Sequence, residues 1–342
     1  MADSNQKNPK CRIIVDAMGG DYAPQNAVVG AIEAYNQSKS FELYLVGKKD
    51  EILSVIRNNQ LTFDENYIIH ADEVIDMGDS PTSALKSKPN SSIVKGAQLV
   101  KEGKADAFVS AGNTGAMMSA STLIMGRIPG VGRPTIGAEM PNINGICYLY
   151  DVGAGKDAKP SHLFEYAIMG TIYAREMGGI QNPTIGILSM GEEESKGNEV
   201  STASYKLLKE SKLNFIGNVE GRDILTKKVD IVVCDGFVGN IILKFGESVP
   251  KLLKHLLTQT ANASFWDKIK VGLSKGSLKK SLKSLDYQEH GGVPLLGVNG
   301  ISIIGHGSST PKAIRNMVLK ANEMYKKDLV RKIENSIKEY SK

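Results

Sequence analysis

The sequence predicts an α/β fold of three layers, in which helices cover both faces of a mainly parallel β-sheet. Short apolar runs alternate with segments of helical periodicity along most of the 342 residues, which is typical of parallel strands joined by helices. Glycine and small polar residues cluster just after these runs, where such sheets place their sites. Hydrophobic residues make up 41% of the chain, which is enough for a full core.

The alternation follows residues 1–10, a polar stretch that we expect to be a disordered leader. Residues 11–342 are expected to form a single α/β catalytic domain, although the length also suits two closely joined lobes. Strands are expected at 12–16, 41–46, 67–70, 107–109, 145–151, 184–188, 230–234 and 301–304. Helices are expected at 24–35, from 50, at 90–102, 113–125, 160–177 and 199–209, and from about 311.

Several helices carry signals of their own. Pro24 suits a first helical turn, where its missing N–H would have no partner anyway. Gly178 and Gly179 end the helix at 160–177. In the helix at 113–125, apolar residues recur at the spacing of one buried face, expected to comprise Ala116, Met117, Ala120, Leu123 and Ile124.

Residues 237–284 interrupt the alternation because their pattern is helical throughout. We expect a protruding helical hairpin insertion there, with a turn near residues 263–267. Its second helix is basic: six lysines occur from Lys268 to Lys283, and no acidic residue follows Asp267 in that interval.

Composition argues against several classes of protein. No run approaches the roughly 18 apolar residues of a membrane-spanning helix, and the polar N-terminus does not resemble a signal peptide. The three cysteines lie far apart in apolar runs, so we expect buried free thiols in a reducing cytosol. The net charge of +5 is too mild to indicate a nucleic-acid partner. Cysteines and histidines also lack the paired spacing of a metal site.

Five clusters of glycine and polar residues follow expected strands. They contain Asp16, Gly19 and Gly20; Gly112, Asn113, Thr114 and Gly115; Lys196 and Asn198; Asp235 and Asn240; and His306, Gly307 and Ser308. Glycine lets the backbone approach a ligand closely, and the free amides at a helix start attract phosphate. Each cluster alone is also compatible with a turn, a helix cap or a solvated surface. Together they predict one cleft that grips phosphate.

These clusters lie within longer motifs, through which the chain closely resembles the phosphate acyltransferases of bacterial phospholipid synthesis, the PlsX family. The matching motifs are DAMGGDYAP (16–24), VSAGNTGA (109–116), GRIPGVGRP (126–134), GEEESKGNE (191–199), GNVEGRDI (217–224), CDGFVGNIILK (234–244) and GGVPLLGVNGISIIGHGSS (291–309). The resemblance runs from Cys11 to the final helix. At one position it breaks: Gly155 stands where the family usually has asparagine, so a substrate contact from that side chain is not expected here.

The resemblance implies a homodimer, a fold related to phosphotransacetylase and the isocitrate dehydrogenases, and no metal or organic cofactor. It implies transfer of a long acyl group from acyl carrier protein to inorganic phosphate in the cytoplasm, giving an acyl phosphate for phospholipid synthesis. Two alternatives stay open: a phosphotransacetylase acting on coenzyme A thioesters, and a non-catalytic adaptor for carrier protein or membrane.

Phosphate dianion is already a nucleophile, so the enzyme need only position it against the thioester and stabilise the developing charges. We assign phosphate to residues 112–115, aided by Ser308 and Lys196. Lys88 and Arg133 either neutralise phosphate or are simply solvated. The same cleft is expected to include Asp16, Gly19, Gly20 and Gly307.

The remaining roles concern the acyl donor. Asn198 and Asn240 are candidate contacts of the oxyanion or of pantetheine. His306 is the candidate proton donor to the leaving thiolate, with Asp235 as its orienter or alternative.

The hairpin has two functional interpretations beside that of a solvated helix face. Its lysines would attract the acidic carrier protein. Equally, aromatic residues beside those lysines would rest on an anionic membrane surface. The residues concerned are Phe265, Trp266, Lys268, Lys270, Lys279 and Lys280.

Overall fold

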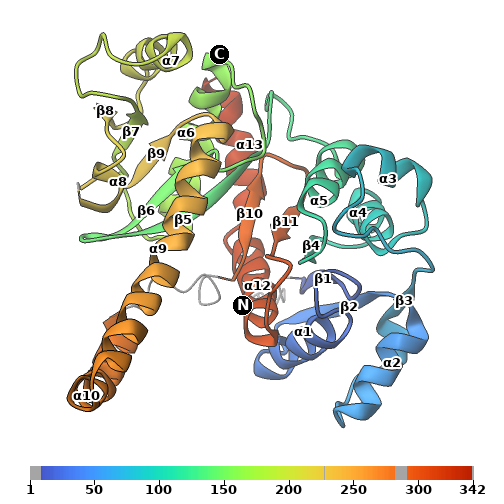
Figure 1. Cartoon of the computed structure of the whole chain (residues 1–342). Helices are drawn as coiled ribbons and strands as arrows, with labels where there is room; N and C mark the ends of the chain where they lie inside the picture. The colour runs from blue at the N-terminus through green and yellow to red at the C-terminus, as the bar shows by residue number, and fades with distance from the viewer. Residues whose placement is uncertain (1–8, 227, 282–290, 341–342) are drawn as a thin grey trace, which may run out of the picture. The chain divides into compact units, whose positions relative to one another are not determined.

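The computed structural model describes residues 9–226, 228–281 and 291–340, without the side chains of 275 and 277–281. The chain divides into two compact units, both drawn in Figure 1. Unit 1 comprises residues 1–128 and 291–331, and unit 2 comprises residues 129–290 and 332–342. Unit 1 is therefore built from two segments far apart in the sequence.

Unit 1 contains a mainly parallel sheet. Its parallel strands lie in the order β3 (Ile68–His70), β2 (Phe41–Gly47), β1 (Cys11–Asp16), β4 (Ala107–Ser110) and β11 (Ile301–Ile304). Strand β10 (Val293–Leu296) pairs antiparallel with β11. The chain adds β2 and β3 on one side of β1 and β4 on the other, so the strand order reverses between β1 and β4. Ligands of open α/β sheets bind at such switch points.

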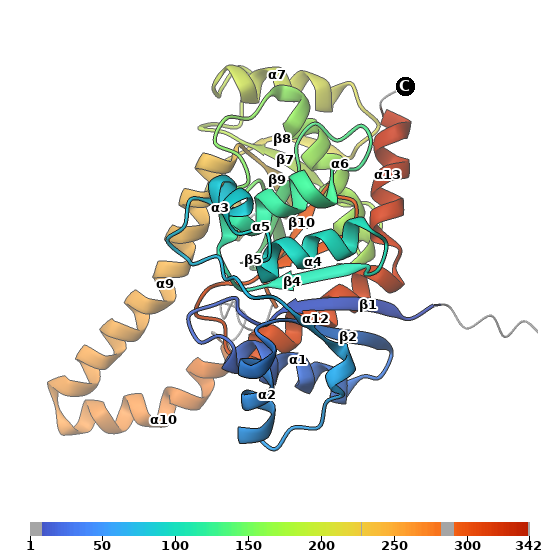
Figure 2. The same cartoon turned by 90° about the vertical axis from the view of Figure 1, so that its right-hand side faces the viewer.

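Helices cover both faces of this sheet, as Figure 2 shows. On one face α1 (Gln25–Gln37) packs against α12 (Pro311–Lys326), and a Cβ added to Gly30 would lie only 2.3 Å from the carbonyl oxygen of Pro311. On the other face α4 (Ser92–Lys101) lies beside α5 (Thr114–Ala120) and the π-helical turn η2 (Ser121–Met125). The remaining elements are α2 (Lys49–Asn58), η1 (Glu65–Tyr67) and α3 (Pro81–Ser87).

Unit 2 contains a second sheet, also mainly parallel. Its strands lie in the order β5 (Thr135–Asn142), β6 (Gly145–Tyr150), β9 (Ile231–Val233), β7 (Ile185–Leu188) and β8 (Phe215–Val219), and only the pair β5–β6 is antiparallel. Helices α6 (Pro160–Glu176) and α7 (Glu199–Lys209) pack together against strands of this sheet. Because β8 and β9 flank β7 on opposite sides, the order reverses here between β7 and β9.

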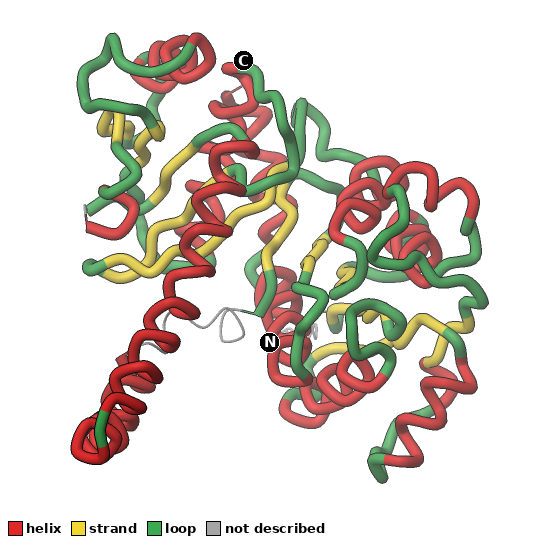
Figure 3. The backbone as a smooth tube through the Cα atoms, viewed as in Figure 1, coloured by secondary structure: helices red, strands yellow, loops and turns green. Residues whose placement is uncertain are grey.

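Four further helices start in or reach unit 2. Helix α8 (Asp223–Thr226) contacts β5, and residues 332–340 of α13 (Leu329–Tyr340) pack against α6 through the pair Lys332–Glu176. Helices α9 (Gly236–Ala263) and α10 (Phe265–Ser281) contact each other, and Ser264 alone separates them (Figure 3).

The predicted α/β class with mainly parallel strands is confirmed. One buried face was predicted wrongly: Ala116, Met117 and Ala120 are buried, but Leu123 is 64% exposed. The helix widens into the π turn at Ser121, which rotates the following residues and brings Met125 inward instead. The single final helix expected from residue 311 is also two helices, because Asp328 adopts a left-handed φ of 55° between them. The three cysteines are buried thiols, as expected.

Candidate active site

Three loops meet at the carboxyl edge of the unit 1 sheet, around its switch point. The carboxylate of Asp16, after β1, accepts a hydrogen bond of 2.6 Å from Ser110 Oγ, after β4. A Cβ on Gly19 would lie 2.7 Å from the amide nitrogen of Gly112, so only glycine permits this approach. The amide of Asp21 donates to the carbonyl of Gly307, after β11, at 2.7 Å. The structure therefore brings together the first, second and fifth predicted clusters.

Asp16 holds these loops in place. It is only 1% exposed, and burial raises its pKa, while donors from Ser110, Ser92 and the amide of Met18 oppose that rise. A buried carboxylate satisfied by three donors is suited to fixing loop geometry. The Ser110 hydroxyl in turn accepts a hydrogen bond from the amide of Gly112 at 3.0 Å. Asp16 therefore positions the loop after β4 indirectly, through Ser110.

The side chain of Asn113 is used within the fold. Its oxygen caps α5 by accepting from the amide of Ala116 at 3.0 Å. Its amide nitrogen donates to the carbonyls of Asp76, Met77 and Asp79 at 3.0–3.2 Å. Contacts of Asn113 with a ligand are therefore left to its backbone. The amides beside it, at Thr114 and Gly115, belong to the first turn of α5.

Lys88, at the end of α3, binds the same 74–79 loop as Asn113. Its ammonium group donates to Asp79 at 2.6 Å, to Asp76 at 3.1 Å and to the carbonyl of Val74 at 2.8 Å. These partners raise the pKa of Lys88, the bond from Asp79 most of all. Two carboxylates thus neutralise the charge of Lys88, which was predicted either to neutralise phosphate or to be solvated.

His306 is exposed at the end of β11. Its Nδ1 accepts a hydrogen bond from the amide of Ser308 at 3.2 Å and lies 2.8 Å from the Ser308 hydroxyl. An amide is always a donor, so Nδ1 is the acceptor and the neutral ring carries its proton on Nε2. Ser308 thereby fixes the tautomer that a proton donor at Nε2 requires.

Asp151, which the sequence analysis did not select, organises the carboxyl edge of unit 2. Its carboxylate is fully buried and accepts hydrogen bonds from the amides of Ile136, Gly153, Ala154 and Gly155 at 2.9–3.2 Å. Burial raises its pKa, and the amide donors oppose the rise. An acidic residue at a strand end, followed by Gly153 and Gly155, is the sequence signal that could have identified this role.

The start of α9 packs on the loop that Asp151 holds. A Cβ on Gly239 would lie 1.8 Å from the carbonyl oxygen of Asp151, so only glycine fits there. Asn240 donates to the carbonyl of Val152 at 3.1 Å, and Asp235 caps α9 by accepting from the amide of Val238 at 3.0 Å. Asn240 therefore fastens the two segments together.

The loop after β7 is held from below by Asn218, which donates to the carbonyl of Glu193 at 2.7 Å. Asn198 caps α7 by accepting from the amide of Ser201 at 2.9 Å. Lys196 is exposed, and none of the ion pairs found in the described part of the chain includes it. Its charge is therefore placed to meet an anion from solution.

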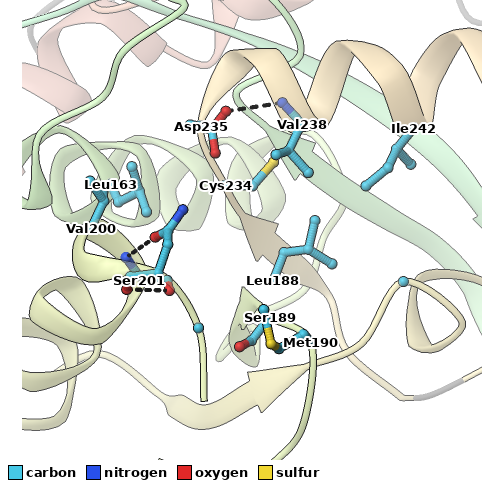
Figure 4. Close-up of a pocket in the computed structure, with 13 residues that line it drawn as sticks. Leu163, Leu188, Ser189, Met190, Val200, Ser201, Cys234, Asp235, Val238 and Ile242 are labelled. Atoms are coloured by element: carbon cyan, nitrogen blue, oxygen red, sulfur yellow. Dashed lines mark hydrogen bonds between the residues drawn. The ribbon is translucent and has the colours of Figure 1, made fainter. Parts of the chain in front are cut away.

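A pocket lies at the switch point of the unit 2 sheet, bounded by the loops after β7 and β9 and by the starts of α7 and α9 (Figure 4). Its volume is about 340 Å³, and it includes Asn198 and Asp235 from the predicted clusters. Its other lining residues are Leu163, Leu188, Ser189, Met190, Gly197, Val200, Ser201, Gly221, Cys234, Val238 and Ile242.

Gly155 leaves room for Arg133. The guanidinium donates to the carbonyl of Asp157 at 2.7 Å, and a Cβ on Gly155 would lie 2.5 Å from Arg133 Nε. At residue 155, where the chain departs from the family motif, the absence of a side chain therefore leaves the space that the Arg133 guanidinium occupies.

Replacing Gly155 by asparagine is expected to lower the free energy of unfolding by about 1–3 kcal/mol, because the new side chain overlaps Arg133. The cost should be at least halved when Arg133 is alanine, and thermal unfolding of the double-mutant cycle measures that coupling. Gly78→Asn is the matched control, since a Cβ at Gly78 meets nothing within 4 Å. Equal losses in both Arg133 backgrounds would contradict the steric cause.

The predicted residues thus fall into two groups, one in each unit. Those of the hairpin lie on α10, and the side chains of Lys279 and Lys280 lie outside the described residues. Besides Asp151, sequence reasoning missed Ser189, a single serine after β7 without a recognisable pattern.

Comparison with known proteins places the chain in a family. A family model described as "Fatty acid synthesis protein" matches residues 11–332. A phosphate acyltransferase of Pelotomaculum thermopropionicum is 46% identical over 326 residues, covering 95% of each chain. One of Chlorobaculum parvum is 48% identical and covers 91% of this chain and 94% of its own.

Solved structures extend the likeness to the fold. A phosphotransacetylase of Streptococcus pyogenes superposes with a TM-score of 0.63, over 92% of this chain and 94% of its own, at 16% identity. A phosphotransacetylase of Staphylococcus aureus superposes with a TM-score of 0.60 over the same shares, also at 16% identity. At such identities the likeness shows the fold alone. The sequence matches, nearly full-length and above 45% identity, show that this chain belongs to the phosphate acyltransferase family and is a transferase.

Proposed function

We propose that the protein transfers a long-chain acyl group from acyl carrier protein to inorganic phosphate, giving an acyl phosphate for phospholipid synthesis. The observation that carries the proposal is the match, over 95% of both chains, to a protein named phosphate acyltransferase. The glycine-rich strand-end loops support it, because their amides and close backbone approaches suit phosphate.

In the proposed reaction an oxygen of HPO₄²⁻ attacks the thioester carbon and forms a C–O bond. The C–S bond then breaks, and the thiolate takes the proton that phosphate brought, so the products are acyl phosphate and free thiol. Neither an acylated serine nor an acylated cysteine is needed. Burial raises the pKa of all three cysteine thiols, which disfavours the nucleophilic thiolate.

From unit 1 we propose the backbone amides of residues 112–115 and the Ser308 hydroxyl as phosphate ligands. Gly112 is positioned by the Asp16–Ser110 pair, and the capped first turn of α5 directs its free amides to the same edge of the sheet. His306 is the proposed proton donor to the thiolate, through its Nε2–H. As that proton leaves, Nδ1 takes the proton of the Ser308 hydroxyl, and Ser308 takes the proton of the bound phosphate. The ring stays neutral, and the net transfer is of the phosphate proton to sulfur.

From unit 2 we propose Lys196 as a contact of the anionic substrate and Asn198 as a donor to the thioester oxygen. The Lys196 charge is exposed and the Asn198 side chain caps α7 with its oxygen, which leaves its N–H groups for a ligand. Asn240 and Asp235 support these residues by holding the start of α9.

The deciding experiment measures release of free thiol from palmitoyl acyl carrier protein with and without phosphate. Phosphate-dependent release, with acyl phosphate trapped by hydroxylamine as the hydroxamate, is the expected result. Palmitoyl and acetyl coenzyme A serve as competing donors. Faster turnover of acetyl coenzyme A would favour a phosphotransacetylase instead, and no release from any donor would overturn the proposal.

Replacing both Lys196 and Asn198 by alanine is expected to lower kcat/KM for phosphate about 10- to 100-fold, the value of one or two hydrogen bonds to a charged group. Because Asn198 also caps α7, a Lys196→Ala, Asn198→Ser variant provides the control, since serine caps a helix but lacks the amide donor. Unchanged turnover in both variants would remove this loop from the mechanism.

We also propose a partner for the hairpin formed by α9 and α10. None of the helices in the described ranges is long and apolar enough to cross a membrane. At the start of α10, however, Phe265 and Trp266 are 72% and 70% exposed, followed by Lys268 and Lys270 on the same helix. Exposed aromatic rings beside lysines suit the interface of an anionic membrane.

Replacing Phe265 and Trp266 by serine is expected to reduce the fraction that sediments with phosphatidylglycerol vesicles at least fivefold, because both rings lose their burial among the acyl chains. Turnover of a soluble donor should stay within twofold. Full sedimentation of the double variant would exclude the membrane contact and leave the carrier protein as partner. The proposed homodimer is checked in the same preparation, as a light-scattering mass twice that of one chain.

A further inference from the structure

The pocket at the switch point of unit 2 is lined largely by apolar side chains. Six apolar side chains line it, from the end of β7, from α6, from α7 and from the first two turns of α9 (Figure 4): Leu163, Leu188, Met190, Val200, Val238 and Ile242. At about 340 Å³, it lies at the small end of the range for ligand sites. Apolar walls hold water poorly, so an apolar ligand gains free energy by entering.

One part of this pocket is polar. The Ser189 hydroxyl is buried and has no hydrogen-bond partner in the described part of the chain. A buried hydroxyl without a partner is costly, so its presence in a pocket wall indicates a ligand group that would pair with it. Asn198 belongs to the same lining, and its oxygen is already bonded to the amide of Ser201. The two residues offer an O–H and an N–H donor to an uncharged acceptor such as a carbonyl oxygen.

Phosphate does not fit this pocket. Its walls are apolar, and the Asp235 carboxylate in its lining would repel a dianion. Cys234 also lines it, but burial raises the pKa of its thiol, so a covalent acyl-cysteine is not favoured. An apolar chain that carries a carbonyl at one end matches both the apolar walls and the two donors.

We infer that this pocket binds the first part of the fatty acyl chain, with the thioester carbonyl at Ser189 and Asn198. The inference rests on the proposed acyl transfer and adds where the chain lies and what selects its length. Each methylene group buried in the pocket would improve kcat/KM about fourfold. Donors with chains too short to fill the pocket would be used poorly.

The test uses two substitutions, on different helices, that each reduce the volume of the pocket. Val238→Phe, on α9, and Val200→Phe, on α7, place a ring inside it, whereas Ile241→Phe places the same ring at an exposed neighbour outside the lining. For each variant, kcat/KM is measured with butanoyl and hexadecanoyl carrier protein at saturating phosphate. We expect at least a tenfold loss for the hexadecanoyl donor in both pocket variants, less than a twofold loss for the butanoyl donor, and no selective loss for Ile241→Phe.

Equal losses for both chain lengths in the two pocket variants would overturn the inference, and so would the absence of loss in both. Binding of the methyl ester of cis-parinaric acid, followed by its fluorescence, gives an answer independent of catalysis. Wild type and Ile241→Phe should bind it, and the two pocket variants at least tenfold more weakly. If wild type made no acyl phosphate but showed this binding pattern, the proposed reaction would fall and the apolar-chain site would stand. Equal binding by all four proteins would refute the site whatever the activity.

Discussion

Replacing Asp151 by alanine is expected to lower the free energy of unfolding by about 3–5 kcal/mol, the largest effect on stability that any single site residue here should show. The carboxylate is the acceptor for four backbone amides, from Ile136 and from three consecutive residues of the following loop. Without it, these donors lose their partner inside the protein, and each unsatisfied buried donor costs about 1–3 kcal/mol unless water replaces the carboxylate.

Chemical denaturation of the purified variant measures this loss. The control is Asp157→Ala, a nearby exposed aspartate that enters the loop's hydrogen bonds only through its backbone carbonyl. That variant should stay within about 0.5 kcal/mol of the wild type. If Asp151→Ala were as stable as the control, water would have taken over all four amides, and the carboxylate would not be what holds the loop.

Replacing His306 by alanine is expected to lower kcat for palmitoyl carrier protein about 10²- to 10⁴-fold, the usual value of a positioned general acid. The loss should shrink to less than tenfold with a thiophenyl ester, because an aryl thiolate leaves readily without a proton. A merely structural histidine would not show this dependence on the leaving group. The comparison therefore isolates proton donation.

His70→Asn provides the matched control, since His70 is also exposed in unit 1 and pairs with Asp72 at the surface. Its rates should stay within twofold of wild type for both esters. An equal loss for the two esters in His306→Ala would assign the proton to another group and leave His306 a role in shaping the loop with Ser308.

Most strands and helices could be predicted from local sequence patterns. Sequence runs such as 107–110 and 301–304 predicted strands because they are short, apolar and bounded by glycine or polar residues. Strands β5, β8 and β10 were missed, since proline or glycine interrupts each of them and their pairing depends on partners distant in sequence. The predicted burial of Leu123 was wrong because a π turn changes the helical period, and an analysis that assumes a constant period cannot detect that change.

The candidate site was predictable in its location and less so in its roles. Clusters at strand ends indicated the correct edges, because parallel strands share one carboxyl edge. What each side chain does there depends on tertiary partners: Asn113 and Lys88 were predicted to bind phosphate, yet their polar side-chain groups bind residues 74–79, in the loop that follows β3. Asp151 was missed for the opposite reason: the sequence did not single it out, and its four amide partners become apparent only in the folded backbone.

The division of unit 1 has a consequence for synthesis on the ribosome. Strand β4 ends at residue 110, but its parallel partner β11 begins only at residue 301, and α12, which covers α1, follows still later. One strand edge and one apolar face of the first 128 residues therefore stay uncovered while residues 129–290 of unit 2 are translated. Such long-range closure slows folding and exposes surfaces that aggregate. A nascent chain stalled before residue 301 should thus depend on chaperones in a way that the completed chain does not.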